Sequence, residues 1–346
     1  MHRTDLNTDL LSNVASNNSE RKSAASAGSC RIGDLSVNRL GFGAKRLAGS
    51  GNSSGSGHSS GGGEEGTGAG RVSAADQERM VGLLRRAVEL GVNHIDTAAF
   101  YPSFRQDRPG NHFSPLNPDG PSNHFTGLNT ANKVIQEALA PYPDDLVIAT
   151  KVGPLEGGLA RPDQLRGLVE ENLRQLKLDT LDVVYLRQHG LDSIAEHFAV
   201  LAALGDQGMI RHLGLSNVRL QHLAQAQEIA PVVAVQNRYG VGFGRVNDEI
   251  LRVCGEQGIA FVPFFAVTAT GREAGGVAES DPVLAIAREH AATPAQIRIA
   301  WTLAQGSHVL AIPGTGNPAH LTENVAAADI QLSPAQLATL DAIPSQ

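Results

Sequence analysis

The sequence predicts an α/β protein built as a (β/α)8 TIM barrel, and three observations lead to this prediction. Eight short segments rich in apolar and β-branched residues alternate along the chain with amphipathic helical patterns. This alternation is typical of a parallel sheet whose strands are connected by helices. Once an N-terminal tail and two insertions are set aside, roughly 270 residues remain, close to the ~250 usual for such a barrel. Polar residues gather at the ends of the segments, where barrels of this kind carry their active sites.

The predicted strands cover residues 38–44, 93–98, 146–153, 181–186, 210–217, 231–237, 259–265 and 308–314. The helical patterns cover 74–91, 130–140, 161–178, 192–208, 218–230, 246–258 and 281–306, the last divided by Thr293-Pro294. Asn317 and Pro318 open another helix, because Asn is a preferred N-cap and Pro fits the first helical position.

The low-complexity segments set the domain boundaries. Residues 1–29 are rich in Ser, Asn and Ala and predict a disordered tail, which leaves 30–346 as the barrel. A Gly/Ser-rich stretch at 49–70 predicts a flexible insertion, and 102–129 predicts a second one. Gly61, Gly63 and Gly66 match a dinucleotide fingerprint in spacing alone, and because no strand precedes them we do not assign them to a phosphate site.

The composition excludes several classes of protein. The net charge of -7 and the absence of a basic run argue against nucleic acid or an anionic membrane as the main partner. Two cysteines, Cys30 and Cys254, argue against a disulfide framework or a structural zinc site. No apolar run reaches about 18 residues, and the N-terminus does not resemble a signal peptide. We therefore expect a cytoplasmic protein that acts on a small molecule, and the oligomeric state stays open.

Three polar residues at predicted strand ends form a chemical set. Asp96 and Tyr101 stand in the stretch GVNHIDTAAFY, and Lys151 ends the next strand. A tyrosine has a pKa of ~10, and a neighbouring ammonium group lowers it. Such a tyrosine can protonate a carbonyl oxygen while hydride reaches the carbon. The same three residues fit a structural role equally well, as a Lys–Asp pair at the barrel rim with a tyrosine that only packs.

Longer motifs make the sequence resemble the aldo-keto reductase family across residues 31 to 343. They are DTAAFY at 96–101, TKV at 150–152, GLSNV at 214–218, VQN at 235–237, IPGT at 312–315 and HLTEN at 320–324. The residues that flank these motifs are most similar to a branch of the family that contains bacterial pyridoxal reductases. The resemblance implies an NADPH-dependent enzyme that reduces an aldehyde or ketone to an alcohol, with pyridoxal as a candidate substrate.

The resemblance also implies a role for each matching residue. Tyr101 is expected to be the general acid, and Lys151 and Asp96 are expected to tune its pKa. Arg187 stands at the position of the family's fourth catalytic residue. The NADP(H) nicotinamide is expected to contact Ser216, Asn217 and Gln236, with Phe261 stacked on its ring. Phe264 is expected in the pyrophosphate groove. The adenosine and its 2′-phosphate are expected near Gly314, Thr315, Asn317, His320, Glu323 and Asn324. No metal is expected.

Three departures from the family pattern leave alternatives open. Arg187 stands where relatives have a catalytic His, and an Arg cannot relay a proton; His189 is a substitute only if it faces the site. Gly314 and His320 replace the Lys and Arg that relatives place near the 2′-phosphate, so NADH use stays open. The insertion at 102–129 carries Asn-His-Phe twice, and it could be a substrate lid, a disordered loop or, less simply, a metal site.

Two other functions compete with the reductase. Lys151 could be the nucleophile of a Schiff-base lyase, although pairing with Asp96 stabilises the charged amine and disfavours this. Alternatively the protein could be a cofactor-binding sensor with weak activity, which the Arg187 replacement and the insertion at 102–129 keep open.

Overall fold

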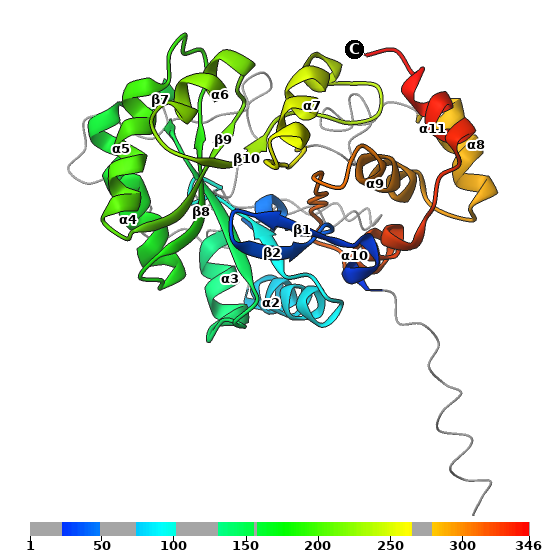
Figure 1. The fold of residues 1–346 in the computed structure, drawn as a ribbon. Helices are drawn as coiled ribbons and strands as arrows, with labels where there is room; N and C mark the ends of the chain where they lie inside the picture. Colours follow the sequence, from blue (N-terminus) through cyan, green and yellow to red (C-terminus); the bar gives the residue numbers. More distant parts are fainter. Residues whose placement is uncertain (1–22, 49–73, 102–130, 156–157, 265–278, 346) are drawn as a thin grey trace, which may run out of the picture.

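The computed structural model describes residues 23–48, 74–101, 131–155, 158–264 and 279–345. A parallel sheet occupies the centre, and helices surround it in a ring (Figure 1). Its strands are ordered β11-β10-β9-β8-β5-β4-β3. Their bounds are β3 Phe42–Gly43, β4 His94–Asp96, β5 Val147–Val152, β8 Leu181–Arg187, β9 Ile210–Ser216, β10 Val232–Gln236 and β11 Ala260–Phe261.

The segment after Gly306 closes this sheet into a barrel. On one side, the Phe261 amide donates to the His308 carbonyl at 2.9 Å. On the other side, the Ala311 amide donates to the Arg39 carbonyl at 2.8 Å. Parallel bridges join Phe261 to Val309 and Leu40 to Ala311. The eighth predicted strand therefore exists as single bridges, and the (β/α)8 barrel prediction is confirmed.

The helices follow the predicted amphipathic patterns, except that α11 was not predicted. They are α2 Ala74–Glu89, α3 Ala131–Leu139, α4 Leu165–Leu176, α5 Ala195–Asp206, α6 Leu220–Gln227, α7 Asp248–Glu256, α8 Asp281–Glu289, α9 Pro294–Ala304, α10 Pro318–Ala326 and α11 Pro334–Asp341. Short 3-10 turns add η1 Ala24–Ala27, η2 Ala44–Ala48, η3 Pro162–Gln164, η4 Arg245–Asn247 and η6 Ala327–Asp329. Thr293 divides α8 from α9 as predicted, because its side chain accepts from the Gln296 amide and caps α9.

Strand alternation divides the core into an inner and an outer layer. Along β5, Val147 and Ala149 belong to the cluster inside the barrel, whereas Ile148 and Val152 pack between the sheet and the helices. Successive side chains of a strand point to opposite faces, so this division continues to the carboxyl ends of the strands. It decides which polar residues reach the mouth of the barrel.

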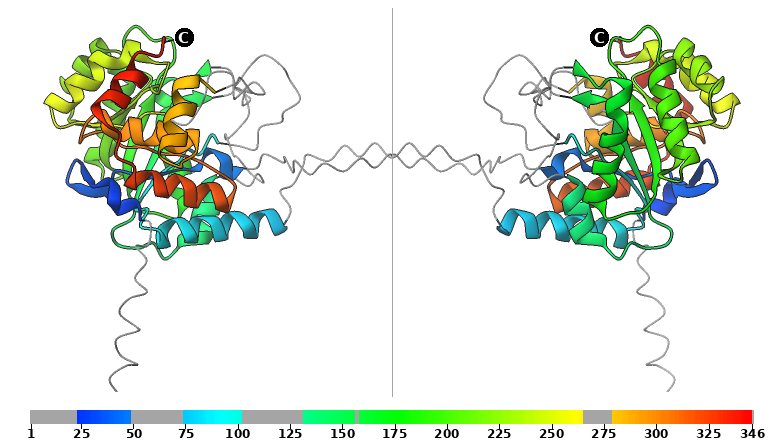
Figure 2. Two further views of the ribbon diagram at one scale, coloured as in Figure 1. Left: turned by 90° about the vertical axis from the view of Figure 1, so that its right-hand side faces the viewer. Right: turned by 90° about the vertical axis from the view of Figure 1, so that its left-hand side faces the viewer.

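A hairpin that the sequence did not predict covers the opposite end of the barrel. Strands β1 (Ser29–Ile32) and β2 (Leu35–Asn38) pair antiparallel, and Ile32 and Val37 are buried in the inner cluster. Figure 2 shows this hairpin at one end and the short β6–β7 pair (Pro154–Leu155, Gly158–Leu159) at the other. The barrel is therefore plugged at the end where its strands begin.

The predicted tail over 1–29 is wrong for its last residues. Residues 24–27 form η1, and Ser29 begins β1. The Ala24 amide donates to the Leu90 carbonyl at 2.8 Å, and the Ala24 side chain is fully buried. These contacts hold the start of the described chain against the end of α2. No helix in the described part of the chain is long and apolar enough to cross a membrane.

Candidate active site

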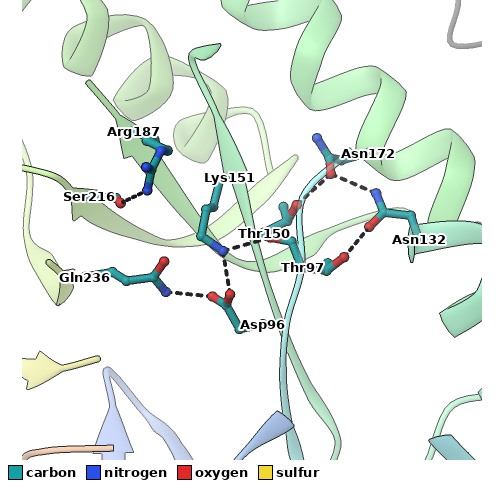
Figure 3. A network of polar contacts seen from close by, with 9 residues as sticks. All are labelled: Asp96, Thr97, Asn132, Thr150, Lys151, Asn172, Arg187, Ser216 and Gln236. Carbon is teal, nitrogen blue, oxygen red and sulfur yellow. Dashed lines mark hydrogen bonds and ion pairs between the residues drawn. The ribbon is translucent and has the colours of Figure 1, made fainter. Parts of the chain in front are cut away.

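A buried ion pair lies at the mouth of the barrel (Figure 3). Asp96 ends β4, Lys151 lies near the end of β5, and alternation turns both side chains inward. The Lys151 Nζ lies 2.5 Å from Asp96 Oδ1, and the side chains are only 1% and 4% exposed. Lys151 also donates to the Thr97 carbonyl at 3.0 Å, and Gln236 Nε2 donates to Asp96 Oδ2 at 2.7 Å. The carboxylate is thus satisfied on both oxygens, and the ammonium group is fixed in place.

Tyr101 lies next to this pair, as the sequence predicts. A turn closed by the Tyr101 amide and the Ala98 carbonyl at 3.1 Å carries the half-buried ring back over Lys151. The Lys151 Nζ lies 5.2 Å from the ring centroid. Burial raises the pKa of Tyr101, while Lys151 and Arg187 oppose that rise and Asp96 adds to it. The net pKa is raised rather than lowered, so the phenol keeps its proton at neutral pH and has one to donate.

Arg187 ends β8 and faces the same space. Its Nη1 donates to Ser216 Oγ at 3.3 Å, and its Cζ lies 5.1 Å from the Phe264 ring centroid. Burial lowers the pKa of this guanidinium, and the nearby Tyr101 and Asp96 raise it. His189, which the sequence left open as a substitute, is exposed.

Ser216, Asn217 and Gln236 come together between β9 and β10. Asn217 has a left-handed backbone with φ 61°, and its Nδ2 donates to the Gln188 carbonyl at 3.0 Å. Among the described residues, Ser216 Oγ is seen only as an acceptor and Gln236 Nε2 only as a donor to Asp96. The Ser216 hydroxyl proton and Gln236 Oε1 therefore remain available as one donor and one acceptor, a complement to an amide group.

The two phenylalanines after β10 lie in different layers, which corrects one assignment. Phe261 is fully buried in the outer layer, and its ring meets Tyr239 edge-on at 5.8 Å. It points toward the helices and cannot stack on a ring at the mouth, so its predicted role is wrong. Phe264 lies three residues further on, is half-buried, and packs against Arg187 at the mouth. Phe264, and not Phe261, is therefore the phenylalanine that lies at this site.

The residues predicted for the adenosine end lie in the loop after the barrel-closing segment and on α10. A Cβ on Gly314 would lie 2.4 Å from the Gly43 carbonyl, so a glycine is needed there for packing. Thr315 Oγ1 accepts from the Asn317 amide at 3.0 Å, and Asn317 Oδ1 caps α10 through the Ala319 amide at 2.9 Å. On α10, His320 is exposed, Glu323 is half-buried and Asn324 is buried. Beside this loop, Arg79 of α2 donates to the Gly316 carbonyl.

Some predictions cannot be placed, and some site residues were not predicted. The insertions at 49–70 and 102–129, with the repeated Asn-His-Phe, lie outside the described residues. Asn132 and Asn172 were missed, although each is a polar residue inside the apolar stripe of a predicted helix. A polar residue in such a stripe is the signal that could have revealed them.

A parallel barrel with a buried Lys–Asp pair and a tyrosine at its carboxyl end is an arrangement that can move a proton at a carbonyl oxygen. Residues 57–344 match the sequence profile of the Aldo/keto reductase family, and the chain belongs to this family. The predicted oxidoreductase class is confirmed.

Individual relatives agree with this assignment. Pyridoxine 4-dehydrogenase of Escherichia coli K12 is 38% identical over 329 residues, covering 90% of this chain and 96% of the relative. The crystal structure of the thermostable aldo-keto reductase Tm1743 with epalrestat matches with a TM-score of 0.67 at 26% identity, covering 91% of this chain and 99% of that one. A Klebsiella pneumoniae aldo/keto reductase with NADP and acetate has a TM-score of 0.68 at 23% identity, covering 92% and 96% of the two chains, and supports the fold.

Proposed function

We propose that this protein is an NADPH-dependent reductase that converts an aldehyde to the alcohol, with pyridoxal to pyridoxine as the first candidate reaction. The observation that carries the proposal is the convergence of Tyr101, Lys151 and Asp96 at the barrel mouth, with the ammonium group 5.2 Å from the phenol ring centroid. The 38% identity to an enzyme named pyridoxine 4-dehydrogenase supports the choice of substrate.

The side chains divide the proton chemistry between them. Tyr101 holds its proton at neutral pH and gives it to the carbonyl oxygen of the substrate. Lys151 stabilises the phenolate that remains, because a fixed cation favours the charged form of its neighbour. Asp96 keeps the ammonium group in position at 2.5 Å. Arg187 adds a second fixed cation and N–H donors that can face the developing negative charge.

The residues around this set fit a nicotinamide cofactor, which would supply the hydride when bound. The Ser216 hydroxyl and Gln236 Oε1 offer a donor and an acceptor for a carboxamide, and Asn217 extends the same edge. The half-buried Phe264 ring offers a surface for stacking. We assign Phe264 rather than Phe261 to this contact.

We assign the adenosine end to the loop and the start of α10 that carry Gly314, Thr315, Asn317, His320, Glu323 and Asn324. The start of α10 favours an anion there, because backbone N–H groups and the helix dipole point toward it. Gly314 and His320 do not supply the permanent cation that a 2′-phosphate prefers, but Arg79 lies against the same loop through Gly316. NADPH is therefore proposed as the main cofactor, with NADH use to be measured beside it.

The arrangement of Lys151 does not favour a Schiff-base lyase. Its side chain is 1% exposed, and two of its three donors are directed to Asp96 and to the Thr97 carbonyl. A nucleophilic lysine needs a neutral amine that can approach a carbonyl carbon. Borohydride trapping with a keto substrate is expected to leave the chain unmodified.

Oxidation of NADPH against a panel of aldehydes that includes pyridoxal tests the proposed function. We expect Tyr101→Phe to reduce turnover by at least a hundredfold, the lower range for loss of general acid catalysis, while NADPH still binds with nearly the same Kd. Tyr142→Phe is the matched control, because that hydroxyl donates to the Leu176 carbonyl at 2.7 Å away from the mouth. Normal turnover by Tyr101→Phe, or no turnover of any aldehyde by the unaltered protein, would overturn the proposal.

A further inference from the structure

Four buried polar side chains lie directly behind the barrel wall at the ion pair. One directly follows β4, one lies in β5, and two come from the covering helices α3 and α4: Thr97, Thr150, Asn132 and Asn172 (Figure 3). The first three are fully buried, and Asn172 is 1% exposed. Polar groups in a dry layer are costly unless they are hydrogen-bonded, so a cluster of four between a sheet and its helices has a specific cause.

Their hydrogen bonds form a chain with one consistent direction. Thr97 Oγ1 donates to Asn132 Oδ1 at 2.8 Å, and Asn132 Nδ2 donates to Asn172 Oδ1 at 3.0 Å. Thr150 Oγ1 donates to the same Asn172 oxygen at 2.6 Å. Asn172 Nδ2 ends the chain on the Leu168 carbonyl at 2.8 Å. Each hydroxyl and each amide has one fixed orientation in this arrangement, which we call the outer polar network.

The outer polar network holds the two backbone segments that carry the ion pair. Thr97 follows Asp96, and Thr150 precedes Lys151. Because side chains alternate along a strand, fixing these threonines on the outer face fixes their neighbours on the inner face. The Thr97 carbonyl also accepts from the Lys151 ammonium at 3.0 Å, so the rotation of the Thr97 residue directly sets one of the contacts of that group.

We propose that Thr97, Thr150, Asn132 and Asn172 are positioning residues that hold the Lys151 ammonium at its working distance from Tyr101. The network touches neither substrate nor cofactor and acts through the backbone of β4 and β5. The inference rests on the proposed function, since it assigns to Lys151 the stabilisation of the Tyr101 phenolate. It extends the site to helices α3 and α4, which otherwise only cover the barrel.

Moving the Lys151 ammonium away from Tyr101 changes the pH profile of the rate, whereas a simple loss of stability does not. Lys151 and Arg187 lower the pKa of Tyr101 against burial and Asp96, which raise it. If Lys151 moves away, the phenol becomes a weaker acid, so proton donation slows and the high-pH limb of the rate profile moves upward. A variant that is merely less stable loses active molecules equally at every pH.

The test uses the full chain with NADPH and the best aldehyde of the panel, and it compares Thr97→Val and Thr150→Val with Thr97→Ser and Thr150→Ser. Valine keeps the shape and removes the hydroxyl, whereas serine keeps the donor. We expect each valine variant to lower kcat about tenfold, below the ~100-fold loss expected for a full 1 Å misplacement, with KM for NADPH unchanged. The high-pH limb of kcat should move up by roughly half a pH unit, and serine should restore both values.

Thr302→Val provides the matched control. Thr302 is also a fully buried threonine, and its hydroxyl donates to the Arg298 carbonyl at 2.8 Å within α9, away from the ion pair. It should lower the unfolding midpoint to a similar degree and leave kcat and its pH profile unchanged.

Two results would overturn the inference. One is a valine variant with normal kcat and an unshifted pH profile. The other is a valine variant whose lower kcat is matched by Thr302→Val or is not restored by serine. Failure of the unaltered protein to reduce any aldehyde would instead refute the proposed function, so the two failures are separate. Should both valine changes prevent folding when combined, each single variant still gives a decisive profile.

Discussion

We expect His94 to make the stability of this barrel depend on pH in a defined way. It begins β4 and points into the barrel two residues before Asp96. The side chain is fully buried, and neither ring nitrogen has a partner among the described residues. A Cβ on Gly41 would lie 2.9 Å from the His94 Nδ1, so the imidazole fills the space that this glycine leaves.

The magnitude follows from the two protonation states of His94. Burial lowers its pKa from 6.5 to about 4, with Lys151 reinforcing this effect and Asp96 opposing it. The unfolded chain binds a proton near pH 6.5 while the folded chain does not, so stability is complete above that pH and falls as the pH drops toward 4. At about 1.4 kcal/mol for each pH unit between the two pKa values, the loss approaches about 3 kcal/mol by pH 4.

Urea unfolding between pH 4 and 7.5, compared with His94→Leu, measures this contribution. Leucine cannot titrate, so the free energy of unfolding of the variant relative to the unaltered protein should rise by about 3 kcal/mol as the pH falls through this range. His189→Gln is the control, because His189 is exposed and its replacement should leave the slope unchanged. Parallel pH curves for the unaltered protein and His94→Leu would refute the reasoning.

Three further predictions concern packing and the ion pair. Lys151→Met should abolish turnover and lower the free energy of unfolding by about 3–5 kcal/mol in urea, because it leaves the Asp96 carboxylate buried without its cation. Adding Asp96→Leu should restore much of that stability and none of the activity, and a double variant as unstable as the single one would contradict this. Arg39→Ala should cost about 2–4 kcal/mol in the same assay, since its guanidinium donates to four backbone carbonyls around the closing segment, and a loss below 1 kcal/mol would contradict it. Gly314→Ala should cost about 1–3 kcal/mol and weaken NADPH binding, because its Cβ would lie 2.4 Å from the Gly43 carbonyl; unchanged melting and Kd would count against this.

The barrel could be predicted because its signals are local and repeated. Apolar segments and helical patterns recur along the chain, and caps such as Thr293 mark helix boundaries within one or two residues. The β1–β2 hairpin could not be predicted in the same way. Its four-residue strands carry too little pattern, and Ile32 and Val37 gain their burial from the barrel floor, a contact that exists only after folding.

Strand parity separates the predicted site residues that the structure brings together from the one that it places elsewhere. Asp96, Lys151, Arg187, Ser216 and Gln236 are brought together on the inward face of the mouth (Figure 3). Ala260 in β11 and Val262 directly after it face inward, so Phe261 between them must face outward. Motif spacing alone does not show which way a side chain points. Side chains alternate along a strand, so counting in steps of two from the inward residues Ala260 and Val262 leads to Phe264.

Arg187 shows how a substitution that conflicts with a family pattern can still be consistent with the chemistry. A histidine at this place would change its charge near neutral pH, whereas a guanidinium stays charged throughout that range. The Phe264 face at 5.1 Å and the Ser216 hydroxyl at 3.3 Å hold the cation beside Tyr101, whose pKa it lowers. Two fixed cations, Lys151 and Arg187, therefore act on one phenol in the proposed proton transfer.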